Sequence, residues 1–85
     1  MARIIDGNEM NMIGSNLRKL RQEKKMSQQA LSDKLEMLAI YICRGSISRI
    51  EDKQRTVTDI ELYGIAKVLG VSILDLYETK EDAEI

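Results

Sequence analysis

The sequence predicts an all-α fold, a compact bundle of five helices in a single domain. Apolar residues recur at spacings of three and four, which is the period of a helix with one buried face. Side-chain capping signals precede several of these stretches, and no segment alternates in the way a strand would. The 85 residues suit one small domain, and the absence of Phe and Trp requires an aliphatic core.

The first helix is predicted to follow a loose N-terminal arm, residues 1–12, which shows no lasting periodicity. Asn11 can cap this helix, because an Asn side chain accepts hydrogen bonds from the free backbone N–H groups of the first turn. Ile13, Leu17 and Leu20 then form one apolar stripe that faces the core.

Two short helices and the connection between them are predicted in the middle of the chain. Ser27 is placed to cap the first of them, which buries Leu31 and Leu35, and the second runs over about 44–52. Polar residues stand at the start of that second helix. Two short helices with this arrangement are typical of a helix-turn-helix motif, which presents side chains to the major groove of DNA.

Two further helices complete the predicted bundle. Thr58 and Glu61 form a capping box at the start of the fourth helix, and Gly70 is expected to end it in a left-handed conformation. Ser72 and Asp75 repeat the capping signal at the start of a short fifth helix. The prediction therefore divides the chain into the arm, a helix-turn-helix domain and an acidic tail, at residues 1–12, 13–78 and 79–85.

Composition excludes several classes of protein. One cysteine, Cys43, forbids an internal disulfide and suits a reducing cytoplasm, and the longest apolar run, 37–43, is too short to span a bilayer. There is no histidine, no metal-ligand spacing, no nucleophile–base pattern and no glycine-rich phosphate loop. The expectation is a cytoplasmic protein that is not an enzyme and takes no cofactor or metal.

The net charge of -1 hides a strong segregation along the chain. Residues 14–55 carry ten Lys and Arg against five acids, whereas residues 56–85 carry two Lys against seven acids. Charge blocks often mean nothing in small helical proteins. Here the basic half coincides with the helix-turn-helix half, and local positive potential is what a DNA-binding surface requires.

Over about residues 13–77 the sequence resembles the phage repressor/Cro-type domain, the Xre family. The matching positions are Arg21, Ser27–Gln28, Leu31, Ile47–Ser48, Ile50–Glu51 and Leu69–Gly70–Val71–Ser72. The resemblance implies a lambda repressor-like DNA-binding domain in a small bacterial or phage transcriptional regulator, usually a repressor. It also implies a homodimer on a palindromic double-stranded operator, because one recognition helix offers few base contacts.

The resemblance also implies roles for individual residues. The base-reading positions fall on Arg44, Gly45, Ser46, Ser48 and Arg49, and the phosphate-binding positions fall on Gln28, Lys53, Gln54 and Arg55. Arg44 is the sharpest of these, because a guanidinium can donate two parallel hydrogen bonds to guanine. The alternatives are a solvated surface arginine, serines that only cap a helix, and an ordinary basic loop.

Two more sets of residues have expected structural roles. Arg21 and Glu51 are expected to pair, as in the family, and to tie the recognition helix to the first helix. The exposed part of the fifth helix, around Ile73, Leu76 and Tyr77, is the candidate dimer surface.

The chain departs from the family between the two motif helices. Ile47 lies sixteen positions after Leu31, about five more than is usual in the family, most simply because of an insertion at 36–40. Either the first motif helix runs on through Met37 and Leu38, or the turn becomes a longer loop packed by Ile40 and Ile42. Met37 is separately expected to fill space in the core. An exposed apolar patch on the insertion would favour a rival function, an antitoxin-like module that masks a partner protein and binds DNA secondarily.

Overall fold

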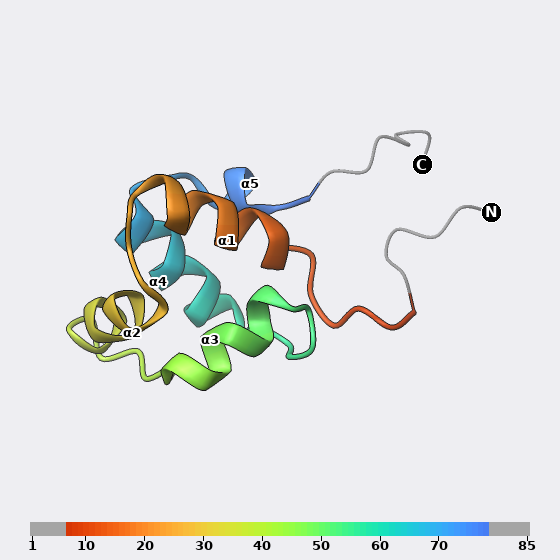
Figure 1. Cartoon of the computed structure of the whole chain (residues 1–85), viewed down its shortest axis with the longest axis horizontal. Coiled ribbons are helices and arrows are strands. Elements are labelled where there is room, and N and C mark those ends of the chain that lie inside the picture. Colours follow the sequence, from red (N-terminus) through yellow and green to blue (C-terminus); the bar gives the residue numbers. More distant parts are fainter. Residues whose placement is uncertain (1–6, 79–85) are drawn as a thin grey trace.

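Five helices and no strand make up residues 7–78, the part of the chain that this computed structural model describes (Figure 1). The helices are α1 Gly14–Glu23, α2 Gln28–Glu36, α3 Arg44–Glu51, α4 Asp59–Leu69 and α5 Ile73–Leu76. The predicted all-α fold is confirmed, with five helices at the expected places. The expectations for the first half of the arm and for the acidic tail concern residues outside the described range.

Side-chain caps begin three of the five helices at the predicted residues. The Ser27 hydroxyl accepts a hydrogen bond from the backbone N–H three residues later, at the start of α2. Thr58 and Glu61 form a reciprocal capping box on α4, and Ser72 and Asp75 form another on α5. Since these bonds satisfy backbone donors that a helix leaves free, they fix where each helix begins.

The core lies where the five helices converge, and α3 is packed against both α1 and α2. Its buried apolar residues are Ile13, Leu17, Leu31, Leu35, Ile42, Ile47, Ile50, Ile65, Ala66, Leu69 and Leu76. Burial of aliphatic side chains supplies most of the stability of such a domain, since each removes apolar surface from water. Packing of α3 on one side only leaves its other side open to solvent.

The inserted residues form a loop and do not extend the preceding helix. Helix α2 ends at Glu36, and Ala39 adopts a left-handed conformation with φ of 64°. The prediction that Met37 fills the core is wrong, since 84% of this residue is exposed. Ile42 is buried instead, and the hydroxyl of Ser32 in α2 donates to its carbonyl oxygen at 2.7 Å.

Gly64 allows this loop to pack directly on α4. A Cβ atom at Gly64 would lie 2.3 Å from Cδ1 of Ile40, so any larger residue would displace the Ile40 side chain. Ile40 is therefore held on α4 and Ile42 in the core, on either side of an exposed Tyr41.

We expect Ala39→Gly to stabilise the protein by up to about 1 kcal/mol. A left-handed backbone is strained for alanine and free of strain for glycine, and this gain exceeds the entropy that glycine adds to the unfolded chain. The free energy of unfolding in urea measures the change. Ala30→Gly, inside α2, is the matched control and should destabilise by about 1 kcal/mol. Equal destabilisation by both changes would contradict the left-handed loop.

The second half of the predicted flexible arm is not free. The backbone N–H of Met10 donates to the carbonyl oxygen of Lys53 at 3.0 Å, and Asn11 is buried. The arm prediction is therefore wrong for these residues. The sequence pattern could not show this, because the partners of this segment lie in the connection between α3 and α4, about forty residues later in the chain.

Candidate DNA interface

The outer side of α3 presents polar and cationic side chains to solvent, from Arg44 at its start to Arg49 in its last turn. Arg44, Gly45 and Arg49 are exposed, while Ser46 and Ser48 are half-buried. Neither arginine forms an ion pair with any residue in the described range 7–78. These guanidinium groups therefore remain available to donate hydrogen bonds to another molecule.

Cys43 caps the start of α3 without a side-chain bond to the helix backbone. Its thiol lies 3.5 Å from the hydroxyl of Ser46. This hydrogen bond, with help from the backbone N–H groups at the helix start, lowers the pKa of the Cys43 thiol. The Ser46 hydroxyl thus has a partner inside the chain, whereas no hydrogen bond of the Ser48 side chain is found among residues 7–78.

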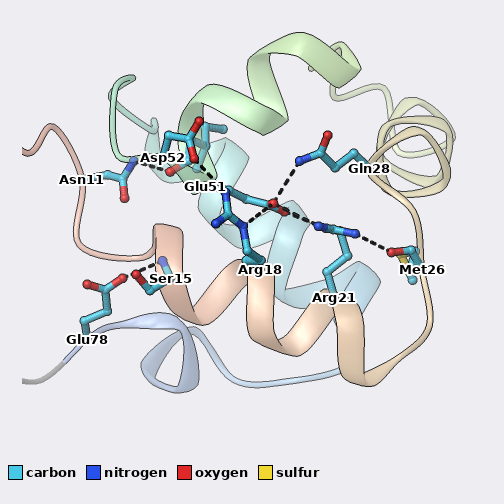
Figure 2. A network of polar contacts seen from close by, with 10 residues as sticks. Asn11, Ser15, Arg18, Arg21, Met26, Gln28, Glu51, Asp52 and Glu78 are labelled. Atoms are coloured by element: carbon cyan, nitrogen blue, oxygen red, sulfur yellow. Dashed lines mark hydrogen bonds and ion pairs between the residues drawn. The ribbon is translucent and has the colours of Figure 1, made fainter.

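Helix α3 is held in place by a buried carboxylate, Glu51, at its C-terminal end (Figure 2). The pairing expected between Arg21 and Glu51 is present: Nε donates to Oε2 at 2.6 Å and Nη2 donates to Oε1 at 3.0 Å. Arg18 adds a bond of 3.2 Å to Oε1, and Gln28 adds one of 3.0 Å. A single acid therefore joins α3 to both α1 and α2.

The charged form of Glu51 is favoured despite its burial. Burial by itself raises the pKa of this carboxyl, but hydrogen bonds from Arg21, Gln28 and Arg18 outweigh it and lower the pKa below its usual value. The carboxylate is consequently ionised at neutral pH. This arrangement fixes the orientation of α3 and supplies no sign of acid–base chemistry.

Two of the four expected phosphate contacts are instead engaged inside the protein. The ammonium of Lys53 forms an ion pair with Glu78 and lies 3.8 Å from Glu9. Both terminal nitrogens of Arg55 donate to Glu61, at 3.0 and 3.1 Å. These carboxylates raise the pKa of Lys53 and of Arg55. The predicted phosphate contacts of Lys53 and Arg55 therefore start from cations that already have carboxylate partners within the protein.

The other two expected phosphate contacts remain near the same edge of the molecule. Gln54 is exposed at the end of α3. Gln28 is half-buried in the first turn of α2, and its amide donates to Glu51, so it also supports α3.

The predicted dimer surface requires one correction. Leu76 is fully buried in the core, so it cannot contact another subunit, and Ile73 and Tyr77 are half-buried. Leu74 is the exposed apolar residue of α5, at 78%. It shares a surface hollow with Tyr63 of α4 and with Ile73. The exposed apolar surface of this region therefore spans α4 and α5.

Two general features of the described part complete the picture. No helix among residues 7–78 is long and apolar enough to cross a membrane. The same residues contain no group of three or more His, Cys, Asp or Glu side chains placed to hold a metal ion.

The fold and this edge define a helix-turn-helix protein: α3 is the second motif helix, held by α1 and α2 and open on its outer side. The family model described as helix-turn-helix matches residues 17–76, which is most of the chain. The protein belongs to this helix-turn-helix family, of the Xre and lambda repressor type.

Solved structures share the same fold. A hypothetical transcription factor from Neisseria, NHTF, matches with a TM-score of 0.70 and 22% identity, over 96% of this chain and 90% of that one. The DNA-binding domain of BldD matches with a TM-score of 0.68 and 20% identity, over 87% of this chain and 100% of that domain. A search of curated proteins found no match. At these identities the likeness concerns the fold.

Proposed function

We propose that this protein is a sequence-specific double-stranded DNA-binding transcriptional regulator of the cytoplasm. The observation that carries the proposal is a pair of exposed guanidinium groups, Arg44 and Arg49, which form no ion pair with residues 7–78. They lie on a helix whose orientation is fixed by buried Glu51. A rigid helix with free donors on its outer side suits direct readout in the major groove. Membership of the helix-turn-helix family supports the same function.

In this proposal the leading edge of α3 reads base edges. Arg44 donates two parallel hydrogen bonds to a guanine, while Ser48 and Arg49 contact neighbouring bases or phosphates. Apart from its chain neighbours and the backbone of its own helix, nothing lies within 4 Å of the place where a Cβ of Gly45 would stand. Packing within the described part of the chain therefore does not require glycine there. A small residue at this point lets the helix approach the base pairs closely.

Phosphate contacts would come first from Gln28 and Gln54. The N-terminal end of α2, where Gln28 lies, also offers backbone donors and the positive end of the helix dipole. Lys53 and Arg55 could bind phosphate only by exchanging their carboxylate partners for it, so their contribution to affinity would be reduced.

A homodimer is expected, since one recognition helix reads too few bases for useful specificity. Leu74 and Tyr63, with Ile73 beside them, are the apolar residues that support a two-fold contact. A dimer on a palindromic operator would exclude polymerase or another regulator, and so act as a repressor.

The proposal is tested by selecting bound duplexes from a random pool with the purified chain at physiological salt. Recovery of a palindrome with half-sites about 10–10.5 base pairs apart would support a dimeric sequence reader. Weak binding that salt abolishes, with no enriched sequence, would contradict sequence-specific recognition.

We expect Arg44→Ala to weaken binding to the selected site by about 1–3 kcal/mol and to relax the choice of base at one position. The reason is the loss of a bidentate contact with guanine. Affinities for the selected site and for single-base variants, measured by fluorescence anisotropy, give both effects. Arg44→Lys is the matched control, because it keeps the charge and loses the paired donors. An equal loss on every sequence would show that Arg44 contacts phosphate only.

A second function is favoured by one observation, the exposed apolar surface of the insertion. Met37, Leu38 and Tyr41 are all exposed, and Met37 and Leu38 line a hollow with Lys34, Lys67 and Val68. Such a surface suits the docking of a partner protein, as in an antitoxin-like module. A second small protein that copurifies with the chain, and is lost with Leu38→Asp while DNA binding persists, would support this function.

A further inference from the structure

The buried side chain of Asn11 joins the start of α1 to the end of α3, and we propose that it is a positioning residue for DNA recognition. This inference rests on the proposed function, since it concerns the pose in which α3 meets base pairs. From the sequence, Asn11 was expected only to cap α1. The structure gives it a second set of partners, one on the recognition helix and one in the connection that follows it.

The Asn11 amide uses its whole hydrogen-bonding capacity within the protein. Its oxygen accepts hydrogen bonds from the backbone N–H groups of Ile13 and Gly14, at 3.0 and 2.9 Å. Its nitrogen donates to the carbonyl oxygens of Ile50 and Arg55, at 3.0 and 2.9 Å. An amide has two donors and two acceptor sites, and only one orientation of this amide matches donors to acceptors at all four contacts.

These bonds act on the end of α3 that lies away from the proposed base-reading edge. Ile50 stands six residues after Arg44, which corresponds to about 9 Å along a helix axis. Over that length, a rotation of roughly 6° about the C-terminal end moves the leading edge by about 1 Å. Recognition sites require placement within about 0.5 Å, so a small loss of restraint at Ile50 would disturb paired hydrogen bonds made by Arg44.

Asn11 and Arg21 restrain α3 from opposite ends of α1 (Figure 2). Arg21 lies in the last turn of α1 and bonds Glu51, whereas Asn11 precedes the first turn and bonds Ile50. The two attachments reach neighbouring residues of α3 from separate points along α1. Asn11 therefore adds to the restraint that Glu51 places on the direction of the recognition helix.

The test uses Asn11→Asp in the full chain. Aspartate has the shape of asparagine and retains the acceptor that caps α1, but it has no N–H to donate to Ile50 and Arg55. We expect affinity for the selected site to fall about tenfold, while affinity for a random-sequence duplex changes by less than about threefold. Asn11→Ala, which removes both sets of bonds without adding a charge, should show the same loss of discrimination.

Ile65→Val is the matched control, because it destabilises the core at a residue of α4 and leaves every side chain and hydrogen bond of α3 in place. Its ratio of selected-site to random-duplex affinity should remain that of the wild type. If the Asn11 variants also keep the wild-type ratio, or lose affinity for both duplexes equally, Asn11 serves stability alone and the inference fails.

Backbone amide exchange separates this inference from the proposed function. Asn11→Asp should speed exchange in α3 about tenfold more than in α4, whatever the protein binds. If the wild type selects no DNA sequence but this selective effect appears, the anchor stands and the DNA function fails. Uniform acceleration in both helices would overturn the anchor.

Discussion

Replacing Glu51 by alanine should lower the free energy of unfolding by about 3–5 kcal/mol. The change leaves the guanidinium of Arg21, whose side chain is 11% exposed, without its carboxylate partner. It also removes the acceptor used by Arg18 and Gln28. Leaving one buried charge without its partner destabilises a protein much more than the intact ion pair stabilises it. Urea unfolding measures the loss, provided that the dependence of the free energy on urea concentration keeps the same slope.

Asp52→Ala is the matched control for this prediction. Asp52 is the adjacent acid, and it also accepts a hydrogen bond from Arg18, at 2.7 Å. Both side chains of that pair are largely exposed, so water screens the interaction and its loss should cost under about 1 kcal/mol. If Glu51→Ala costs no more than Asp52→Ala, Glu51 does not hold α3.

The same contacts predict how stability depends on pH. The pKa of Glu51 is lower in the folded protein than in the unfolded chain, so its contribution is present above the unfolded value, about 4.3. That contribution is lost as the pH falls through the folded value. Wild-type stability should decline below about pH 4.3, and Glu51→Ala should decline less steeply. Equal declines would mean that other acids, such as Glu61 paired with Arg55, account for acid unfolding.

Structural features that depend on residues close together in the chain could be predicted from the sequence. A cap such as Ser27 or Thr58 bonds a backbone group three residues later, so its residue types and spacing suffice. The pairing of Arg21 with Glu51 spans thirty residues and was expected only through the family resemblance. The capping bonds, in contrast, were predicted from the sequence without the family resemblance.

The charged loop after α3 shows why contacts between residues far apart in the chain could not be predicted from the sequence. Lys53 and Arg55 look alike in the sequence as solvent-facing cations, and only the fold brings Glu78 next to Lys53. Lys53 also has a left-handed backbone, φ 60°, a conformation that glycine adopts most readily. The turn is therefore kept without the residue type that normally signals it.

The other wrong predictions, for Leu76 and Met37, concern short segments. A helix of four residues, as α5 is, has too few positions for its period to identify the buried face, so Leu76 and Leu74 could not be told apart. Met37 is apolar and follows an amphipathic helix, yet that helix stops one residue earlier. In both cases, moving the predicted position by one or two residues changes a buried side chain into an exposed one.

Replacing Gly14 by alanine should destabilise the protein by about 3 kcal/mol or more. A Cβ at this position would lie 2.4 Å from the carbonyl oxygen of Ile50 and 2.9 Å from that of Glu51. Both atoms belong to the backbone of α3, which cannot move aside as a flexible side chain would. The clash therefore outweighs the gain of about 1 kcal/mol that alanine brings to a helix.

Gly45→Ala is the matched control, because Gly45 also lies in a helix but has nothing within 4 Å of its Cβ position. It should stabilise the protein by up to about 1 kcal/mol, since only helix propensity changes. Thermal and urea unfolding of the two variants should thus shift in opposite directions. If Gly14→Ala is as stable as the wild type, the start of α1 does not lie against the end of α3. That result would also contradict the hydrogen bond between Asn11 and Ile50, because this bond and the packing of Gly14 depend on the same close approach of the two helices.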